Sequence, residues 1–176
     1  DDGSLDLKYV DSVTSRLGEL VGEKEEYHTI VYRSTMLPGS TASMMKNLER
    51  LSGKKVGVDF GVVFNPEFMR EGSAIDDFFQ PPKTVYGATD SKASNVLREL
   101  YSFSSAVIFE LEIKEAELVK YVDNAYHALK VSFANEIGRI GKSQGINAKI
   151  VMNVFCSDTE LNISEKYLTP GFSYGG

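Results

Sequence analysis

The chain has 176 residues, of which 42% are hydrophobic and 25% are charged. This is the composition of a globular protein with a hydrophobic core, so it excludes a disordered, collagen-like or low-complexity chain. No apolar run reaches the roughly 18–20 residues of a membrane-spanning helix. The net charge of −6 argues against nucleic acid as the main partner, because nucleic-acid-binding proteins usually present a basic face.

Strands alternate with helices in the first two thirds of the chain. Apolar residues recur at helical spacing after Ser4, which can serve as an N-cap, and Gly22 is placed to end this first helix. Runs rich in β-branched and aromatic residues predict the strands. This alternation favours a parallel α/β sheet. The expected order is helix 4–22, strand 27–33, helix 40–51, strand 57–64, strand 84–87, helix 90–103 and strand 106–109.

The last third of the chain is expected to be helical. One helical pattern without proline runs over 112–145, and shorter helices are expected at 148–156 and 162–168. We therefore expect an α/β domain over 1–110 and a helical domain over 111–176. Neither a G-x-G-x-x-G turn nor a P-loop occurs, so a dinucleotide-binding unit in this chain would lack the turn that holds the pyrophosphate.

The segment from Asn65 to Gly72 directly follows a predicted strand and is bounded by Pro and Gly. Open α/β sheets bind their ligands at the carboxyl ends of strands. Glu67 and Glu71 are four residues apart here, so one can act as a general base and the other can contact a ribose or an amide. The alternative is a solvated turn whose glutamates cap a following helix.

A polar stripe lies on the long predicted helix. At 3.6 residues per turn, Lys120, Asn124 and His127 share one face of a helix that is otherwise largely apolar. An unpaired buried ammonium is unfavourable, so this face must meet water, a partner or a polar pocket. A lysine held there can stabilise an oxyanion, with the Asn amide as a second donor. The alternative is a face that is simply exposed to solvent.

Two hydroxyls and one thiol are further candidates. Ser34 and Thr35 follow the first strand, where a hydroxyl can hold a cofactor or a water molecule, or form a local turn hydrogen bond. Cys156 ends an apolar helical stretch and is expected to be a buried structural thiol. One cysteine and two histidines without paired ligand spacing predict no metal site. A single cysteine also suits a reducing compartment, so we expect a cytoplasmic protein.

Residues 34–39 read Ser-Thr-Met-Leu-Pro-Gly, residues 65–72 read Asn-Pro-Glu-Phe-Met-Arg-Glu-Gly, and residues 117–124 read Glu-Leu-Val-Lys-Tyr-Val-Asp-Asn. In this order the three segments resemble the signature blocks of the UDP-glucose/GDP-mannose dehydrogenase family. Residues 52–61 and 133–138 look closest to the GDP-mannose branch. The resemblance implies a partial Rossmann-like domain followed by a helical central domain. It also implies an enzyme that oxidises the C6 alcohol of a nucleotide sugar to a carboxylate in two steps, reducing two NAD through a cysteine thioester.

The resemblance implies a role in cofactor binding and catalysis for the residues after the two strands. Thr35 would lie near the nicotinamide and the reacting water, next to Ser34 in the cofactor site. Glu67 would be the general base for hydrolysis of the thioester, and Glu71 would contact cofactor or substrate.

The resemblance also assigns the polar helical stripe to the substrate. Lys120 and Asn124 would stabilise the oxyanion formed at C6, which agrees with their reading as one polar face. The positions implied to bind the nucleotide sugar are Phe68, Met69, Arg70, Glu71, Lys120, Asn124, His127, Asn135, Tyr167 and Phe172.

Residues in the C-terminal part of the chain bear on the choice of nucleotide sugar, on the position of the catalytic cysteine and on dimerisation. Lys166 and Thr169 stand where the GDP-mannose branch has Tyr and Arg, so the choice of nucleotide sugar stays open. The family's catalytic cysteine is expected just beyond Gly176, and Cys156 lies upstream in a different context. We therefore expect these 176 residues alone to be inactive. The helix over 112–145 resembles the family's dimerisation core, so we expect a homodimer.

Two other functions fit parts of the pattern. β-Hydroxyacid dehydrogenases related to 6-phosphogluconate dehydrogenase also place Lys and Asn four residues apart on a long helix, but segment 65–72 argues against that class. A non-enzymatic dimerisation module built on the helix over 112–145 is the third alternative.

Overall fold

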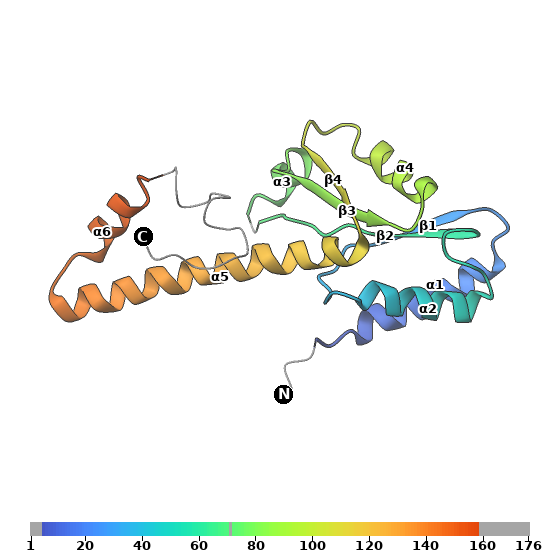
Figure 1. The fold of residues 1–176 in the computed structure, drawn as a ribbon, viewed down its shortest axis with the longest axis horizontal. Helices are drawn as coiled ribbons and strands as arrows, with labels where there is room; N and C mark the ends of the chain where they lie inside the picture. Colours follow the sequence, from blue (N-terminus) through green and yellow to red (C-terminus); the bar gives the residue numbers. More distant parts are fainter. Residues whose placement is uncertain (1–4, 71, 159–176) are drawn as a thin grey trace, which may run out of the picture. The chain divides into compact units, whose positions relative to one another are not determined.

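A computed structural model of the chain describes residues 5–70 and 72–158. The chain forms two compact units that divide after Asn124, inside one continuous helix. In chain order the elements are α1 (Lys8–Glu23), β1 (His28–Tyr32), α2 (Ser40–Ser52), β2 (Phe60–Phe64), α3 (Ala74–Phe79), β3 (Thr84–Ala88), α4 (Ser91–Leu100), β4 (Ile108–Leu111), α5 (Ile113–Gln144) and α6 (Ala148–Phe155), as drawn in Figure 1.

The four strands form one sheet in the order β1-β2-β3-β4. The pairs β1–β2 and β3–β4 are parallel, but β2 and β3 are antiparallel, so the expectation of a fully parallel sheet is wrong at this pair. A parallel connection must carry the chain back along the whole length of a strand. The six-residue α3 spans only about 9 Å. The chain therefore re-enters the sheet from the edge at which β2 ends.

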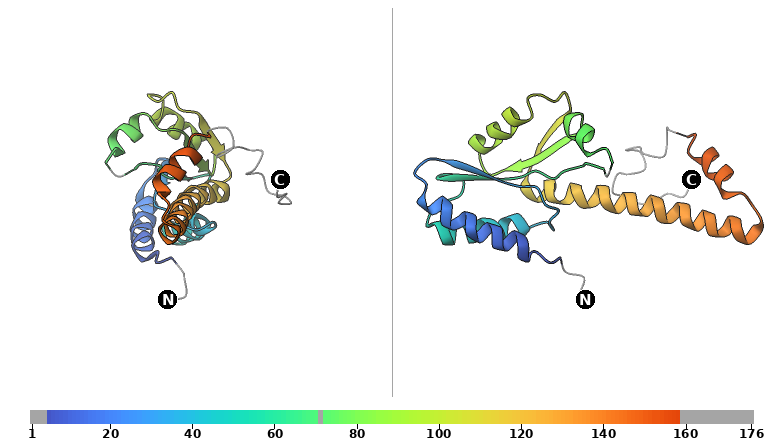
Figure 2. Two further views of the ribbon diagram at one scale, coloured as in Figure 1. Left: turned by 90° about the vertical axis from the view of Figure 1, so that its left-hand side faces the viewer. Right: turned by 180° about the vertical axis from the view of Figure 1, so that it is seen from behind.

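Helices cover both faces of the sheet in the first unit. Figure 1 and the rear view in Figure 2 show α1 and α2 side by side on one face and α4 on the other. Every residue of β2 is buried, because its side chains point alternately to the two layers. Val62 and Phe64 join the core under α1 and α2, whereas Val63 packs with Leu97 of α4.

The first helix begins and ends later than expected. Leu7, and not Ser4, is the N-cap, and the Asp6 carboxylate accepts a hydrogen bond from the Lys8 backbone N–H at 3.0 Å. Gly22 is inside the helix, where an added Cβ would lie 3.2 Å from the Ser52 carbonyl oxygen. This glycine therefore permits close packing of α1 against the end of α2 and does not terminate α1.

The remaining boundaries differ from expectation mainly at turns. β2 starts at Phe60, because a turn with Gly57 at φ +79° precedes it and the Gly57 N–H bonds to the Phe60 carbonyl. The short α3 was not expected, and β4 lies two residues later than predicted. The helix expected to start at Asp90 has this residue as its N-cap, since the Asp90 carboxylate accepts hydrogen bonds from the N–H groups of Lys92 and Ala93. The helix expected at 162–168 lies outside the described residues.

The second unit contains the later turns of α5 and the helix α6. The rings of Phe133 and Phe155 lie 5.5 Å apart between these two helices. The prediction that Cys156 is buried is wrong: it is exposed, at the C-cap of an α6 that contributes no buried residue. No helix in the described part of the chain combines the length and the apolar character needed to span a bilayer.

Candidate active site

The candidate site centres on a lysine–carboxylate pair that joins α5 to the chain after β2. The Lys120 ammonium donates one hydrogen bond to the Glu67 backbone carbonyl at 2.5 Å and one to Glu67 Oε1 at 3.1 Å. The Lys120 side chain is only 9% exposed and that of Glu67 is 32% exposed. The predicted polar stripe is therefore not a solvated face at Lys120, because the ammonium is buried against a counter-ion.

Glu67 is held in its ionised form. Burial opposes ionisation, but the Met69 backbone N–H and the Lys120 ammonium outweigh it, with a further contribution from Arg33, so the pKa of Glu67 lies below its ordinary value. Met69 N–H donates to Glu67 Oε2 at 2.7 Å. A carboxylate at neutral pH can accept a proton, which a general base requires.

Phe68 lies between two ammonium groups. The Lys83 Nζ atom lies 4.8 Å from the centre of the Phe68 ring and the Lys120 Nζ atom lies 5.4 Å from it, within the range of cation–π attraction. Lys83, just before β3, also forms an ion pair with Asp123 of α5 at 2.7 Å. The ring and this ion pair hold the chain after β2 and the chain before β3 against the same helix.

Arg70 donates hydrogen bonds to another residue of the chain, Asp77. Its guanidinium and its backbone N–H all donate to the carboxylate of Asp77 in α3, at 2.7–3.1 Å. The hydrogen bonds from Arg70 and from Ser73 keep the pKa of the buried Asp77 carboxyl well below its ordinary value. This clasp closes the loop between β2 and α3.

Asn65 anchors the start of the signature segment. Its buried side chain donates to the Val85 carbonyl at 2.9 Å and accepts from the Tyr101 hydroxyl at 2.6 Å. The Asn65 backbone N–H donates to the Tyr32 carbonyl at the end of β1. The carboxyl ends of β1 and β2 are thereby tied together just before Thr35 and Glu67, respectively.

The loop after β1 carries the predicted hydroxyls. Ser34 is exposed and Thr35 is half-buried, so ligands can reach both from the edge of the sheet. The loop ends at Gly39, whose φ of +96° favours glycine. From α5, the carboxylate of Glu117 accepts a hydrogen bond from the Gly39 N–H at 2.5 Å.

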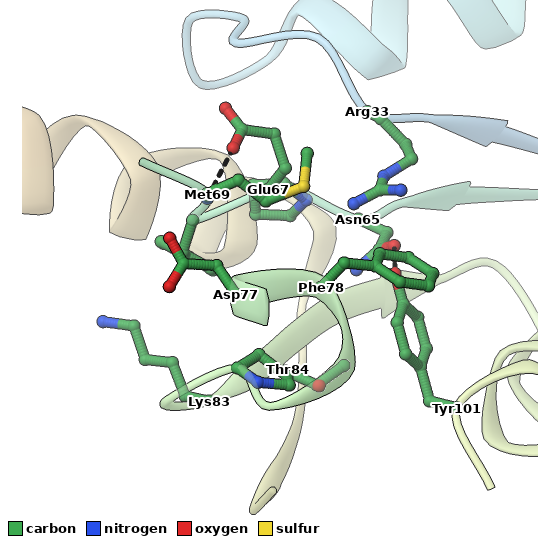
Figure 3. A pocket seen from close by; sticks show the side chains of 12 residues that line it. Arg33, Asn65, Glu67, Met69, Asp77, Phe78, Lys83, Thr84 and Tyr101 are labelled. Atoms are coloured by element: carbon green, nitrogen blue, oxygen red, sulfur yellow. Dashed lines mark hydrogen bonds between the residues drawn. The ribbon is translucent and has the colours of Figure 1, made fainter. Parts of the chain in front are cut away.

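A small pocket lies beside Glu67 at this edge. Figure 3 shows Arg33 extending into it from the end of β1, with Phe78 and Tyr101 opposite and Lys83 on its other side. Its charged lining residues are two cationic ones, Arg33 and Lys83, and two acidic ones, Glu67 and Asp77, so both signs of charge are present.

The structure brings together only part of the predicted residue set. Glu67, Phe68 and Lys120 are in contact, and Ser34 and Thr35 lie at the neighbouring strand end. Asn124 follows Lys120 by one turn of α5 and is exposed. The other predicted residues either fall in the second unit, as His127 and Asn135 do, or lie outside the described residues, as Glu71, Tyr167 and Phe172 do.

Sequence reasoning missed several residues that hold the site. Glu117 has a recognisable signal, because it lies three residues before Lys120 and therefore on a neighbouring position of the same helical face. Asn65 belongs to a recognised segment, but its bond to Tyr101 spans 36 residues and has no local pattern. The Arg70–Asp77 and Lys83–Asp123 pairs likewise depend on how distant loops meet.

Two sequence models of protein families match the chain. The UDP-glucose/GDP-mannose dehydrogenase family, NAD binding domain, matches residues 1–104, and the central domain of the same family matches residues 114–176. The chain belongs to the UDP-glucose/GDP-mannose dehydrogenase family. The resemblance seen in the three sequence segments is thereby confirmed, and NAD is the cofactor of this family's first domain.

Curated relatives of the family align with almost the whole chain. GDP-mannose 6-dehydrogenase of Pseudomonas syringae pv. tomato is 49% identical over 175 residues, which are 99% of this chain and 40% of the relative. UDP-glucose 6-dehydrogenase of Haloferax volcanii is 35% identical over 182 residues, covering 100% of this chain and 42% of the relative. The chain thus spans about two fifths of the length of these relatives.

Solved structures of the family share the fold. A ternary complex of GDP-mannose dehydrogenase from Pseudomonas aeruginosa matches with a TM-score of 0.95 and 46% identity, covering 100% of this chain and 41% of that one. UDP-glucose dehydrogenase from Pyrobaculum islandicum matches with a TM-score of 0.83 and 40% identity, over 89% of this chain and 36% of that one. The expected class, a partial Rossmann-like α/β sheet followed by helices, is confirmed.

The first unit carries polar residues where a nucleotide cofactor could bind. Hydroxyls and a carboxylate lie at the carboxyl ends of two parallel strands, the position at which such sheets bind nucleotides. The chain has no G-x-G-x-x-G turn for the pyrophosphate. Ser34, Thr35 and Glu67 are therefore the residues of this strand edge that could contact NAD.

Proposed function

We propose that this chain forms part of an NAD-dependent nucleotide-sugar 6-dehydrogenase, with GDP-mannose as the expected substrate. The reaction would oxidise the C6 alcohol to a carboxylate through two hydride transfers and a cysteine thioester. The observation that carries the proposal is the buried Lys120–Glu67 pair, which lies within the family's signature segments at the strand ends.

The two groups of the pair suit complementary tasks. Lys120 is oriented by the Glu67 carbonyl in a poorly hydrated position, so its Nζ can donate to an oxyanion at C6, with the Asn124 amide as a second donor. NAD, when bound, accepts the hydride from C6 in each oxidation. Glu67 would take a proton from the water that attacks the thioester carbonyl, while the cysteine thiolate leaves.

The contact between Lys120 and Glu67 links these tasks. Lys120 is one cause of the lowered pKa of Glu67. When the ammonium turns to an oxyanion on the substrate, that influence weakens and Glu67 becomes a stronger base. The same contact that holds Lys120 in the free protein thus restrains Glu67 until substrate is present.

Further features of the proposal concern substrate, assembly and nucleophile. The half-buried ring of Phe68 and the backbone of Met69 and Arg70 would line the nucleotide-sugar site, together with Glu71, His127, Asn135, Tyr167 and Phe172. Family membership favours this reaction over that of the β-hydroxyacid dehydrogenases. Cys156 is not assigned as the nucleophile. The proposal also includes a domain boundary near residue 110, a homodimer formed through 112–145 and a cytoplasmic location.

The test is NADH formation by the protein expressed from its complete reading frame. GDP-mannose is expected to give two NADH per sugar, with UDP-glucose as the comparison substrate. Lys120→Ala removes the oxyanion donor, so it should lower kcat about 100- to 1,000-fold. Lys114→Ala, an exposed lysine on the first turn of the same helix, is the matched control and should leave kcat unchanged.

Two results would contradict the proposal. The first is no NADH formation from either nucleotide sugar by folded protein. The second is equal activity of the Lys120→Ala and Lys114→Ala variants. The 176 residues alone are expected to form no NADH, since they contain no cysteine other than Cys156.

A further inference from the structure

Glu117 is a buried acidic residue to which the family resemblance assigns no role. Its side chain is 0% exposed. The carboxylate accepts hydrogen bonds from the Gly39 N–H at 2.5 Å, from the Thr41 N–H at 2.7 Å and from the Thr41 hydroxyl at 2.6 Å. Such charge-assisted bonds replace the water that a buried carboxylate loses, and the positive end of the α2 dipole adds to them. Glu117 therefore fastens α5 to the start of α2.

The segment that Glu117 holds is the end of the loop carrying Thr35. The near end of this loop is fixed by β1, whose Tyr32 carbonyl accepts the Asn65 N–H at 2.8 Å. The middle is fixed by Met36, which is 0% exposed in the core under α1 and α2. The far end leads into α2, whose Met44 and Leu48 are buried in the same core, and the start of α2 also meets the Glu117 carboxylate.

One helical turn connects this anchor to the catalytic pair. Glu117 and Lys120 are three residues apart on α5, so their side chains leave neighbouring positions of one face. Lys120 contacts Glu67 directly, through the carbonyl and the carboxylate. A single rigid turn of α5 thus spans from the Thr35 loop to the Lys120–Glu67 pair.

We propose that Glu117 is a positioning residue, which sets the Thr35 loop at its working distance from Lys120 and Glu67. The inference rests on the proposed function, because only a reaction gives that distance a purpose. Groups that act on one reacting carbon must share a narrow geometry, and displacement by about 1 Å can slow a reaction by about 100-fold. Glu117 would act on the rate without touching either ligand.

Glu117→Gln tests this in the protein expressed from its complete reading frame. The amide NH₂ replaces one acceptor oxygen and faces backbone N–H donors, so α2 and the loop must shift. We expect kcat per folded active site to fall about 10- to 100-fold, with KM for NAD and for GDP-mannose changing less than about threefold. Glu99→Gln makes the same chemical change on the exposed face of α4 and should leave kcat unchanged.

A double-mutant cycle separates positioning from simple stability. If Glu117 acts through the Thr35 loop, the double variant Glu117→Gln/Thr35→Ser will lose less kcat than the product of the two single-variant losses. A lower melting temperature with unchanged kcat per folded site, or fully multiplicative effects, would overturn the proposal. If Glu117→Gln does not fold, Thr41→Val keeps both backbone bonds and removes only the hydroxyl, and the same cycle is run with it.

The failure of the proposed function gives a different result. In that case the wild-type protein forms no NADH, and the anchor is tested by NMR on this chain. Glu117→Gln should then move the backbone amide resonances of Thr35 and Gly39, whereas Glu99→Gln should not. Unchanged Thr35 resonances in Glu117→Gln would overturn the positioning role independently of any activity.

Discussion

At the residue scale, the site depends on charges that are buried together with their partners. The Lys120 ammonium has lost most of its water and is compensated by two oxygens of Glu67. Removing one partner of such a pair leaves the other with an unmet desolvation penalty. The pair is therefore a structural contact as well as a candidate catalytic one, and its strength depends on pH.

Glu67→Gln should lower the free energy of unfolding by about 1–3 kcal/mol at pH 7, because Lys120 loses its counter-ion and is left with uncharged oxygen acceptors. The pKa of Glu67 in the folded protein lies below the ordinary value of 4.5, so its stabilisation is complete above that value and is lost as the pH falls below it. Urea unfolding of wild type and variant at several pH values measures this.

The difference in the free energy of unfolding between wild type and Glu67→Gln should thus shrink as the pH falls below 4.5. Glu99→Gln, an exposed change of the same kind, should alter stability by less than about 0.5 kcal/mol at every pH. A difference that stays constant from neutral to acidic pH would show that the Glu67 carboxylate does not stabilise the fold through its charge.

Tyr101→Phe tests the anchor of the signature segment. The Tyr101 hydroxyl is the donor to the buried Asn65 Oδ1 at 2.6 Å, so its removal leaves a buried acceptor unpaired. We expect a loss of about 1–3 kcal/mol in the free energy of unfolding. Tyr9→Phe, at a residue that is 75% exposed, is the control. Equal effects of the two variants in urea unfolding would contradict the assigned hydrogen bond.

At the scale of elements, α5 fastens three successive loops of the first unit with residues spaced three apart. Glu117 binds the loop between β1 and α2, Lys120 binds the chain after β2, and Asp123 binds Lys83 before β3. Residues three apart are neighbours on a helix surface, so each of these residues is next to the following one while the set winds gradually around α5. The first turns of α5 therefore determine how the strand ends are arranged around the pocket.

Gly87→Ala should disturb this arrangement. An added Cβ at Gly87 in β3 would lie 2.6 Å from the Ile113 Cα, which is backbone at the start of α5 and cannot rotate away. We expect the free energy of unfolding to fall by about 1–3 kcal/mol. At Gly138, within α5, an added Cβ meets nothing within 4 Å, so Gly138→Ala should be neutral or stabilising. Thermal unfolding compares the two, and equal melting temperatures would contradict the close approach.

At the scale of the whole molecule, the second unit exposes much apolar surface. Leu129 is 62% exposed, Ile150 61% and Val154 69%, and no residue of α6 is buried. Contiguous exposed apolar surface is characteristic of protein interfaces. This exposed apolar surface supports the proposed homodimer through the long helix.

Leu129→Lys should therefore weaken self-association. A charge placed in an apolar interface must be desolvated, so we expect the dimer dissociation constant to rise about tenfold or more. Ile75→Lys introduces the same charge at a 76% exposed position in α3 of the first unit and is the control. Sedimentation of both variants gives the answer. A monomeric wild type, or equal association of both variants, would contradict dimerisation through this helix.

The sequence by itself determined the features that depend on neighbouring residues. Helical periodicity located α5 to within one residue at each end, the start of α4 was placed at Asp90, and three local segments indicated the family. These features can be predicted without knowledge of the fold, because they arise from hydrogen bonds and side-chain spacing within one element.

Only the tertiary structure decided which distant residues meet. It reversed the expected direction of β3, exposed Cys156, and placed Lys120 against Glu67 rather than in solvent. It also gave Glu117 its three donors from the start of α2. Contacts across 53 or 78 residues leave no periodic trace in a sequence, since their geometry depends on how loops and helices pack against one another.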